Sequence, residues 1–409
     1  MGLASFRIAG RALPRSEASE SAAKTIPQAG RQPGRFAMLD RDAAAAMAVE
    51  WRSLVGRVAE DNIFFDPDFT LPAMTAMGRG VTIATWRTPD GALAALAPVT
   101  ATRLGRIAPA TRIWCHEYGP LGVPLIDRTM VDQAVRGLLD GLMEGGRSLI
   151  MPDLTVHRPV AKAIANAAKA AGCGIAVIDG HQRAKLKQSP SGGVDCRAAL
   201  PLRRRKEYSR QMRRLADLGE VAIETASEPE DVRNRFEEFL ALEAAGWKGK
   251  RGTALAALPG IAAMTRQIVA NRAANRTMRI DSIRLDQRPI AMLVSFLEGA
   301  TAYSWKIAFD EAHARFSPGA QLMLEAGRTL LSIPGIRRID SCAAADHPMI
   351  DHLWRDRLAV GTLVIGPAGG SLLHATGLAA MKAELRGRAL ARRLVHRVGR
   401  LRAARAESD

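Results

Sequence analysis

The chain has few aromatic residues, few cysteines and no long uncharged apolar run. Aromatic residues make up 5% of its 409 residues and form no patch interleaved with arginine, which argues against nucleic acid as the main partner. The four cysteines, Cys115, Cys173, Cys196 and Cys342, lie far apart without a C-x-x-C pair, so no zinc site or disulfide framework is predicted. No run of about eighteen uncharged apolar residues occurs, and no transmembrane helix is predicted.

Lysine is scarce in a strongly basic chain. Only 10 of the 58 basic residues are lysine, and the formal net charge is +17. Such a charge suits an anionic membrane or a nucleic acid, although the abundance of Arg, Ala and Gly is also typical of GC-rich coding sequence. With 47% hydrophobic residues, a chain of this length is expected to fold into two or three globular domains.

The N-terminal residues 1–36 are rich in Ala, Ser, Arg and Gly and contain no apolar core long enough for a secretory signal. Phe6 stands where a myristoylation motif requires Ser or Thr. We therefore predict a disordered tail, with an organellar leader as the lesser alternative. Reduced thiols favour a cytoplasmic protein, either free or peripheral at the inner membrane.

Helix and strand patterns alternate along the rest of the chain, which is typical of a mixed α/β layer fold. A Ser-Gly-rich break at Ser189 to Gly193 divides the chain, and a similar order of elements begins again after it. In each part a helix precedes a hairpin with an Asp-containing turn: VTIATWRTPDGALAALAPV in the first and MRIDSIRLDQRPIAMLVSFL in the second. This weak internal repeat predicts two similarly folded halves.

Two basic helices are predicted. The stretch RRRKEYSRQMRRLADLG follows the break and is most simply an exposed cationic helix. The C-terminal segment 371–409 places Leu390, Leu394, Val398 and Leu401 on one face among many arginines. We expect it to be a basic amphipathic helix that packs on the second domain, with contact to an anionic membrane surface as the alternative.

The stretch AYSWKIAFDEAHARFSPGAQLMLEAGRTLL, Ala302 to Leu331, changes from a strand pattern to a helix pattern. Residues 302–309 alternate and are partly aromatic, whereas Ser317 is suited to cap a helix and Pro318 to its first turn. The first turn of such a helix has free backbone N–H groups and a positive dipole end. Either Ser317 merely satisfies these groups or, because Gly319 lacks a side chain, they hold a phosphate.

Three stretches together resemble a known family. They are LEAAGWKGKRGTAL (242–255), RPIAMLVSFLEGATAYSWKIAFDEAHARFSPGAQLMLE (288–325) and IRRIDSCAAADHPMIDHLW (336–354). They resemble the CelD/BcsL-like acetyltransferases of the GNAT superfamily, which are associated with cellulose and other exopolysaccharide synthesis and are related to the Fem-type aminoacyl transferases. The resemblance is strongest over residues 242–354 and covers neither the tail nor the final helix.

The resemblance implies an α/β (α+β) fold: tandem GNAT-like acyltransferase domains with mixed sheets flanked by helices, followed by a C-terminal basic helix. It divides the chain into a tail (1–36), a first, degenerate domain (37–188), a second, acyltransferase domain (194–370) and the helix (371–409).

In the GNAT fold, a strand splays from its neighbour and the next helix N-terminus receives the coenzyme A pyrophosphate. The resemblance thus implies that acetyl-CoA or another acyl-CoA is the co-substrate. The implied donor contacts are Arg315, Ser317, Gly319 and Ala320. Pro318 removes one N–H donor that the usual loop supplies, which keeps other activated acyl donors open.

Acyl transfer needs a group that removes a proton, donors that stabilise the oxyanion, and two positioned substrates. The candidate catalytic residues are Glu243 and Asp310, as general bases, and Lys306, as a cation. The candidate substrate contacts are Trp247, Lys248, Tyr303 and Trp305. For most of these residues a core, capping or surface role is the plainer interpretation. His347 and His352, with Asp346 and Asp351, have no third ligand placed by spacing, so no metal is predicted.

The predicted function is direct transfer of an acyl group from acyl-CoA to a small-molecule or saccharide acceptor of envelope or exopolysaccharide synthesis. Two alternatives stay open. The first is a Fem-like transferase, for which charged tRNA would be a partner with steeply salt-dependent binding. The second is a non-catalytic GNAT-like scaffold, held at the membrane by the basic C-terminal helix.

Overall fold

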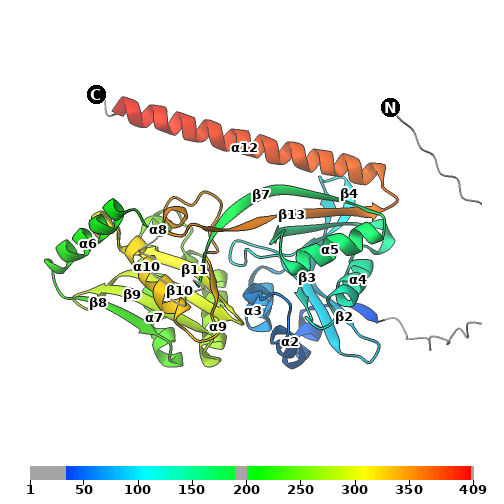
Figure 1. Ribbon diagram of the computed structural model, residues 1–409, viewed down its shortest axis with the longest axis horizontal. Coiled ribbons are helices and arrows are strands. Elements are labelled where there is room, and N and C mark those ends of the chain that lie inside the picture. Colours follow the sequence, from blue (N-terminus) through cyan, green and yellow to red (C-terminus); the bar gives the residue numbers. More distant parts are fainter. Residues whose placement is uncertain (1–33, 189–199, 407–409) are drawn as a thin grey trace, which may run out of the picture. The chain divides into compact units, whose positions relative to one another are not determined.

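A computed structural model describes residues 34–188 and 200–406 of the chain (Figure 1). The predicted tail lies outside the described residues except for its last three positions, and the first strand, β1, begins at Arg35. The Ser-Gly segment at 189–193 also lies outside them.

Two halves of the chain contribute to one continuous mixed sheet of 13 strands. The strands of the first half are β1 (Arg35–Leu39), β2 (Val81–Arg87), β3 (Leu93–Leu104), β4 (Ala108–Ile113), β5 (Leu125–Ile126), β6 (Ser148–Leu154) and β7 (Cys173–Lys187). Those of the second half are β8 (Val221–Ala226), β9 (Met278–Leu285), β10 (Arg288–Glu298), β11 (Thr301–Phe309), β12 (Arg338–Asp340) and β13 (Asp356–Ala368). The order across the sheet is β1-β2-β3-β4-β6-β13-β7-β12-β11-β10-β9-β8, with β5 paired to β3.

The two halves have the same strand pairings. In the first half, β1/β2, β2/β3 and β3/β4 are antiparallel and β4/β6 is parallel. In the second half, β8/β9, β9/β10 and β10/β11 are antiparallel and β11/β12 is parallel. This equivalence confirms the predicted α/β class and the predicted pair of similarly folded halves.

The halves exchange their last strands. β7, from the first half, pairs with β12 of the second, and β13, from the second half, pairs with β6 of the first. β7 and β13 also pair with each other, antiparallel, from Asp356 opposite Lys185 to Ala368 opposite Cys173, and they run side by side through the centre of Figure 1. The sequence predicted only the first part of β7 and did not predict β13.

Helices cover both faces of the sheet. The α-helices of the first half are α1 (Arg41–Ala46), α2 (Ala48–Val55), α3 (Pro67–Met77), α4 (Val131–Leu142) and α5 (Pro159–Ala170). After them come α6 (Leu202–Ala216), α7 (Pro229–Ala245), α8 (Trp247–Lys250), α9 (Pro259–Ala274), α10 (Pro318–Leu331), α11 (Ile350–Leu353) and α12 (Leu372–Ala406). Short 3₁₀ turns are η1 (Ile63–Phe65), η2 (Glu144–Gly146), η3 (Leu255–Ala257) and η4 (Glu311–Phe316).

Strand β10 is buried on both faces. Met292, Val294 and Phe296 pack into the core that contains α7 and α9. Ala291 and Leu293 pack into the core that contains α10. A strand buried on both faces is expected to be a continuous apolar run, as IAMLVSFL is.

The C-terminal helix α12 packs on β3 and β4 of the first half and on β13 of the second, so it contacts both halves and not the second domain alone. Leu378, Met381 and Leu385 lie against a small core of these strands, and Ser148 Oγ is 2.8 Å from His374 Nδ1. The helix lies alongside β7 and β13 in Figure 1. Leu390 is 59% exposed, whereas the side chains of Leu394, Val398 and Leu401 lie outside the described residues.

Among the described residues, no single helix is both long and apolar enough to cross a membrane. The segments Trp247–Ala257 and Pro259–Ala274 reach that length and composition only as a pair, bent by 66°.

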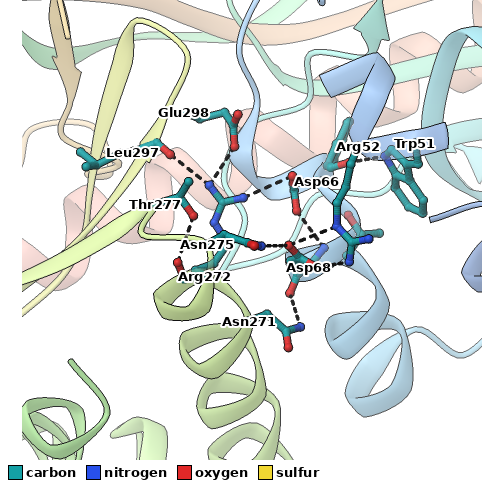
Figure 2. A network of polar contacts seen from close by, with 12 residues as sticks. Trp51, Arg52, Asp66, Asp68, Asn271, Arg272, Asn275, Thr277, Leu297 and Glu298 are labelled. Atoms are coloured by element: carbon teal, nitrogen blue, oxygen red, sulfur yellow. Dashed lines mark hydrogen bonds and ion pairs between the residues drawn. The ribbon is translucent and has the colours of Figure 1, made fainter. Parts of the chain in front are cut away.

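A buried ionic network joins the two halves away from the exchanged strands (Figure 2). Arg272, on α9, is 2% exposed and lies 3.2 Å from Asp66 of the first half and 2.8 Å from Glu298 at the end of β10. Asn275, the residue that follows α9, donates to Asp68 Oδ2 at 2.8 Å, and Arg52 binds the other oxygen of Asp68 at 2.6 Å. Burial raises the pKa of Asp66 and Glu298, while Arg272 opposes that rise.

Candidate active site

The candidate site lies at the point where strands β11 and β12 stop pairing. The two strands pair only from Thr301–Arg338 to Tyr303–Asp340, whereas β11 stays paired with β10 as far as Phe309. The second part of β11 therefore has one free edge. A register shift between Val294 and Ser295 of β10 lies opposite the point where the strands separate.

A cavity of about 310 Å³ lies at the free end of β11. It is enclosed by the end of α7, the start of α8, the last residues of β11 and the segment after β12. Its lining residues are Leu242, Glu243, Gly246, Trp247, Lys248, Ile307, Ala308, Phe309, His347, Pro348 and Met349. Trp247 is 45% exposed, so it forms the rim of this cavity and is not a core residue.

Glu243 and Lys248 form an ion pair in the wall of the cavity. Lys248 Nζ lies 2.7 Å from Glu243 Oε1 and also donates to Ile307 O at 3.3 Å. Glu243 is 3% exposed, and its second oxygen accepts the Leu255 N–H at 2.7 Å. Because both carboxylate oxygens are engaged, this geometry favours Glu243 as the residue that holds Lys248 in place.

Lys306 lies next to the cavity wall with no carboxylate partner within ion-pair distance among the described residues. Its ammonium is 4.9 Å from the centre of the Tyr118 ring and 5.7 Å from that of Trp305, which are cation–π distances. Burial lowers the pKa of Lys306, and the nearby Lys248 lowers it further, while Glu243 opposes the shift. Lys306, Lys248 and Glu243 therefore lie near one another where β11 has separated from β12.

Replacing Lys248 by Met is expected to raise the pKa of Lys306. The substitution removes the cation that lowers this pKa and leaves Glu243, which raises it, without its partner. The Lys306 ammonium should therefore titrate at higher pH, as measured by NMR of labelled lysine side chains. Lys250→Met, which alters an exposed pair with Glu311, is the control and should leave the titration of Lys306 unchanged. An unchanged Lys306 pKa in Lys248→Met would contradict the electrostatic coupling.

A loop of the first half contacts β11 and Lys306 beside the cavity. Trp305 Nε1 donates to the backbone oxygen of Tyr118 at 2.7 Å, so a loop of the first half is bound to β11 of the second. Burial raises the pKa of Tyr118 to about 12, and burial with the nearby Lys306 lowers the pKa of His116 to about 4. Both side chains are therefore neutral around Lys306 at neutral pH. Sequence reasoning missed Tyr118 and His116.

His347 is a further lining residue that the sequence did not assign to this site. Its Nδ1 accepts the backbone N–H groups of Met349 and Ile350 at 3.3 and 3.4 Å. The neutral ring then carries its proton on Nε2. Burial lowers the pKa of His347, which favours this neutral form. His347 can consequently donate a hydrogen bond in the cavity.

Helix α10 begins behind the cavity wall. A Cβ on Gly319 would lie 3.4 Å from Phe309 and 3.7 Å from both Ile307 and Met349, all of which line the cavity. The predicted side-chain cap by Ser317 is wrong, since its side chain accepts no N–H of the first turn. Ser317 has a φ of 51°, in the left-handed region, whereas a capping side chain needs extended backbone. The first-turn N–H groups are left for another acceptor.

The other predicted residues lie apart from the cavity lining. Asp310 accepts from Ala312 N and His313 Nδ1, both at 2.9 Å, and so caps η4. Arg315 is exposed on η4, and Ala320 is buried in the first turn of α10. Tyr303 and Trp305 are buried in the core. In residues 34–188 and 200–406, no three His, Cys, Asp or Glu side chains are grouped to hold a metal ion.

One protein-family model matches part of this chain. Residues 203–347 match the model described as the acetyltransferase (GNAT) domain. The second half is thus similar to GNAT domains over this range. The match begins in α6, includes the Lys248 and Lys306 segments, and ends at His347. No curated protein matches the chain at a significant level.

Two solved structures share the fold of both halves. One is named as the C-terminal domain (DUF2156) of a lysylphosphatidylglycerol synthetase from Agrobacterium fabrum, with 11% identity, a TM-score of 0.51, and coverage of 83% of this chain and 96% of that one. The other is FemX, with 11% identity, a TM-score of 0.50, and coverage of 81% and 96%. At this identity the likeness concerns the fold.

Proposed function

We propose that this protein transfers an acyl group directly from acetyl-CoA or another acyl-CoA to an amine or hydroxyl of an envelope or exopolysaccharide precursor. The observation that supports this most is the cavity at the free end of β11, which Glu243, Lys248 and His347 line within the GNAT domain. The resemblance of residues 242–354 to CelD/BcsL-like proteins supports the class of acceptor.

The proposed reaction is a single displacement without a covalent enzyme intermediate. The acceptor nitrogen or oxygen attacks the thioester carbonyl, the C–S bond breaks, and the departing thiolate takes up the proton that the acceptor loses. The oxyanion that forms at the carbonyl needs preorganised donors. Lys248 and the Nε2–H of His347 are suited to this role because both line the cavity.

The start of α10 is proposed as the place for the donor's phosphates. Its first-turn N–H groups have no side-chain cap, and the positive end of the helix dipole favours an anion there. The exposed ring of Trp247 at the rim would then face the acceptor. We place the reaction in the cytoplasm, near the inner membrane, where the cationic helix α12 could contact anionic lipid.

Gly319→Trp is expected to abolish binding of acetyl-CoA. An indole at this position would displace Phe309, Ile307 and Met349 and obstruct the start of α10. Calorimetric titration should show binding in the unmodified protein and none in the variant. Gly260→Trp is the matched control, since Gly260 lies near the start of another helix and a Cβ there meets nothing within 4 Å. Lack of binding in the unmodified protein would refute acetyl-CoA as donor.

A second candidate donor is an aminoacyl-tRNA. Helix α6 packs against η4, next to the start of α10, and its residues Arg203, Arg204 and Lys206 are exposed. A cationic face beside the donor site suits a longer polyanion than coenzyme A. Binding of charged tRNA that weakens steeply with salt, and that fails in a variant with these three residues changed to Gln, would favour this candidate.

A further inference from the structure

A second, smaller cavity lies between the two halves and shares no lining residue with the candidate active site. Its volume is about 40 Å³, which leaves room for a few water molecules or one small oxyanion. Residues from β7, β11, β12 and β13, from the loops after α2 and before β5, and from the segment between β6 and α5 enclose it. The charged residues among them are Glu60, Asp61, Arg158, Lys185, Arg338 and Asp340.

The carboxylates of this cavity already have partners. Glu60 accepts from Arg158 Nε at 2.8 Å and from the Val160 N–H at 2.7 Å. Asp61 accepts from Arg338 Nη2 at 2.9 Å and from Thr301 Oγ1 at 2.8 Å. These bonds neutralise two of the three negative charges.

The third carboxylate, Asp340, is held by groups outside the cavity. It accepts the Cys342 N–H at 2.8 Å and lies 3.5 Å from the buried Arg183. None of the three carboxylates is therefore left to pair with Lys185.

Lys185 is the charged group of the cavity without a partner. Within residues 34–188 and 200–406 its ammonium has no hydrogen bond and no ion pair at 4 Å or less. It is half-buried, and burial together with Lys187, Arg158 and Arg338 lowers its pKa. Asp356, opposite Lys185 in the β7/β13 register, is the carboxylate that attracts it. Partial burial of a lysine ammonium beside two arginines is unfavourable in free energy unless an anion binds to it.

We propose that the cavity between the halves binds a free oxyanion of phosphate size, held by Lys185, Arg158 and Arg338. Both arginines are partly exposed, at 30% and 29% of their side chains, so an anion has access to them from solvent. Arg158 and Arg338 come from different halves, and Lys185 lies on an exchanged strand. A bound oxyanion would therefore link both halves and stabilise the assembled sheet. This inference does not depend on the proposed acyl transfer.

The test is thermal unfolding in sodium phosphate against sodium chloride of equal ionic strength. A phosphate concentration ten times the dissociation constant should raise the midpoint temperature of unfolding by about 2 °C. Lys185→Met should lose this response, whereas Lys187→Met, an exposed neighbour outside the cavity, should keep it. Lys306→Met should also keep it, which separates this cavity from the candidate active site.

The stability of Lys185→Met without phosphate gives a second readout. If Lys185 were a structural residue, the variant would unfold at lower temperature. We expect an unchanged or higher midpoint, because the variant removes a cation that other cations repel. A phosphate response of full size in Lys185→Met, or none in the unmodified protein, would overturn the proposal. An equal response to glycerol 3-phosphate would overturn the assignment to a free oxyanion.

Discussion

Lys306→Met is expected to lower acyl transfer by roughly a hundredfold or more while the protein stays folded. Met keeps the length of the side chain and its contacts with the rings of Tyr118 and Trp305, but it removes the charge. In the part of the chain that the structure describes, Lys306 has no carboxylate within ion-pair distance, since Glu243 pairs with Lys248. Negative charge that develops in the cavity would lose a cation beside it that has no ion-pair partner.

The loss can be measured before an acceptor is known, as release of free thiol from acetyl-CoA with water as the acceptor. Circular dichroism and the unfolding midpoint would show whether the variant is folded. Lys250→Met, which alters an exposed pair with Glu311, should retain full activity. Equal thiol release by Lys306→Met and the unmodified protein would exclude a role for the charge. No release by either would favour a scaffold or a different donor.

Arg272→Met is expected to destabilise the protein by about 3–5 kcal/mol, because it leaves buried carboxylates without their partner. Arg272 contacts Asp66 and Glu298, as Figure 2 shows, and all three are largely removed from water. The free energy of unfolding from urea titration measures the effect. Arg266→Met, on the same helix, breaks an exposed pair with Glu237 and should cost about 1 kcal/mol or less.

The destabilisation by Arg272→Met should grow as the pH rises. Burial raises the pKa of Asp66 and Glu298 in the folded protein, and loss of Arg272 removes the charge that opposes this rise. The folded variant then binds protons more tightly than the unfolded chain, so its stability is present at acid pH and lost as the carboxylates ionise. A variant equally destabilised at pH 5 and pH 8 would contradict this origin of the effect.

The site residues that could be predicted from the sequence are those that lie near one another along the chain. Glu243, Trp247 and Lys248 lie within six positions, so a helix end and its following turn bring them together. His347 lies in the same cavity only because β11 and β12 pair over three residues and then separate. Tyr118 reaches Trp305 across 187 positions of sequence, which no local pattern indicates.

The strands that the sequence failed to predict are those whose pairing depends on the other half. Residues 179–187 of β7 are mostly charged or polar, as in a surface loop, yet they pair with both β13 and β12. The Ser317 cap failed for a local reason, because the preceding 3₁₀ turn sets its backbone in the left-handed region. Tertiary partners and local strain both override propensity in this chain.

The exchanged strands also set the order in which the sheet can be completed during synthesis. The outer edge of β6 receives its partner only when β13 is made, about 200 residues later along the chain. At usual translation rates this takes roughly 10–40 s, during which that edge of the sheet stays open. An open edge is where one chain can pair with another, so nascent copies on neighbouring ribosomes are at risk of joining through β6. Closure of the first half thus waits for a strand that is synthesised with the second half.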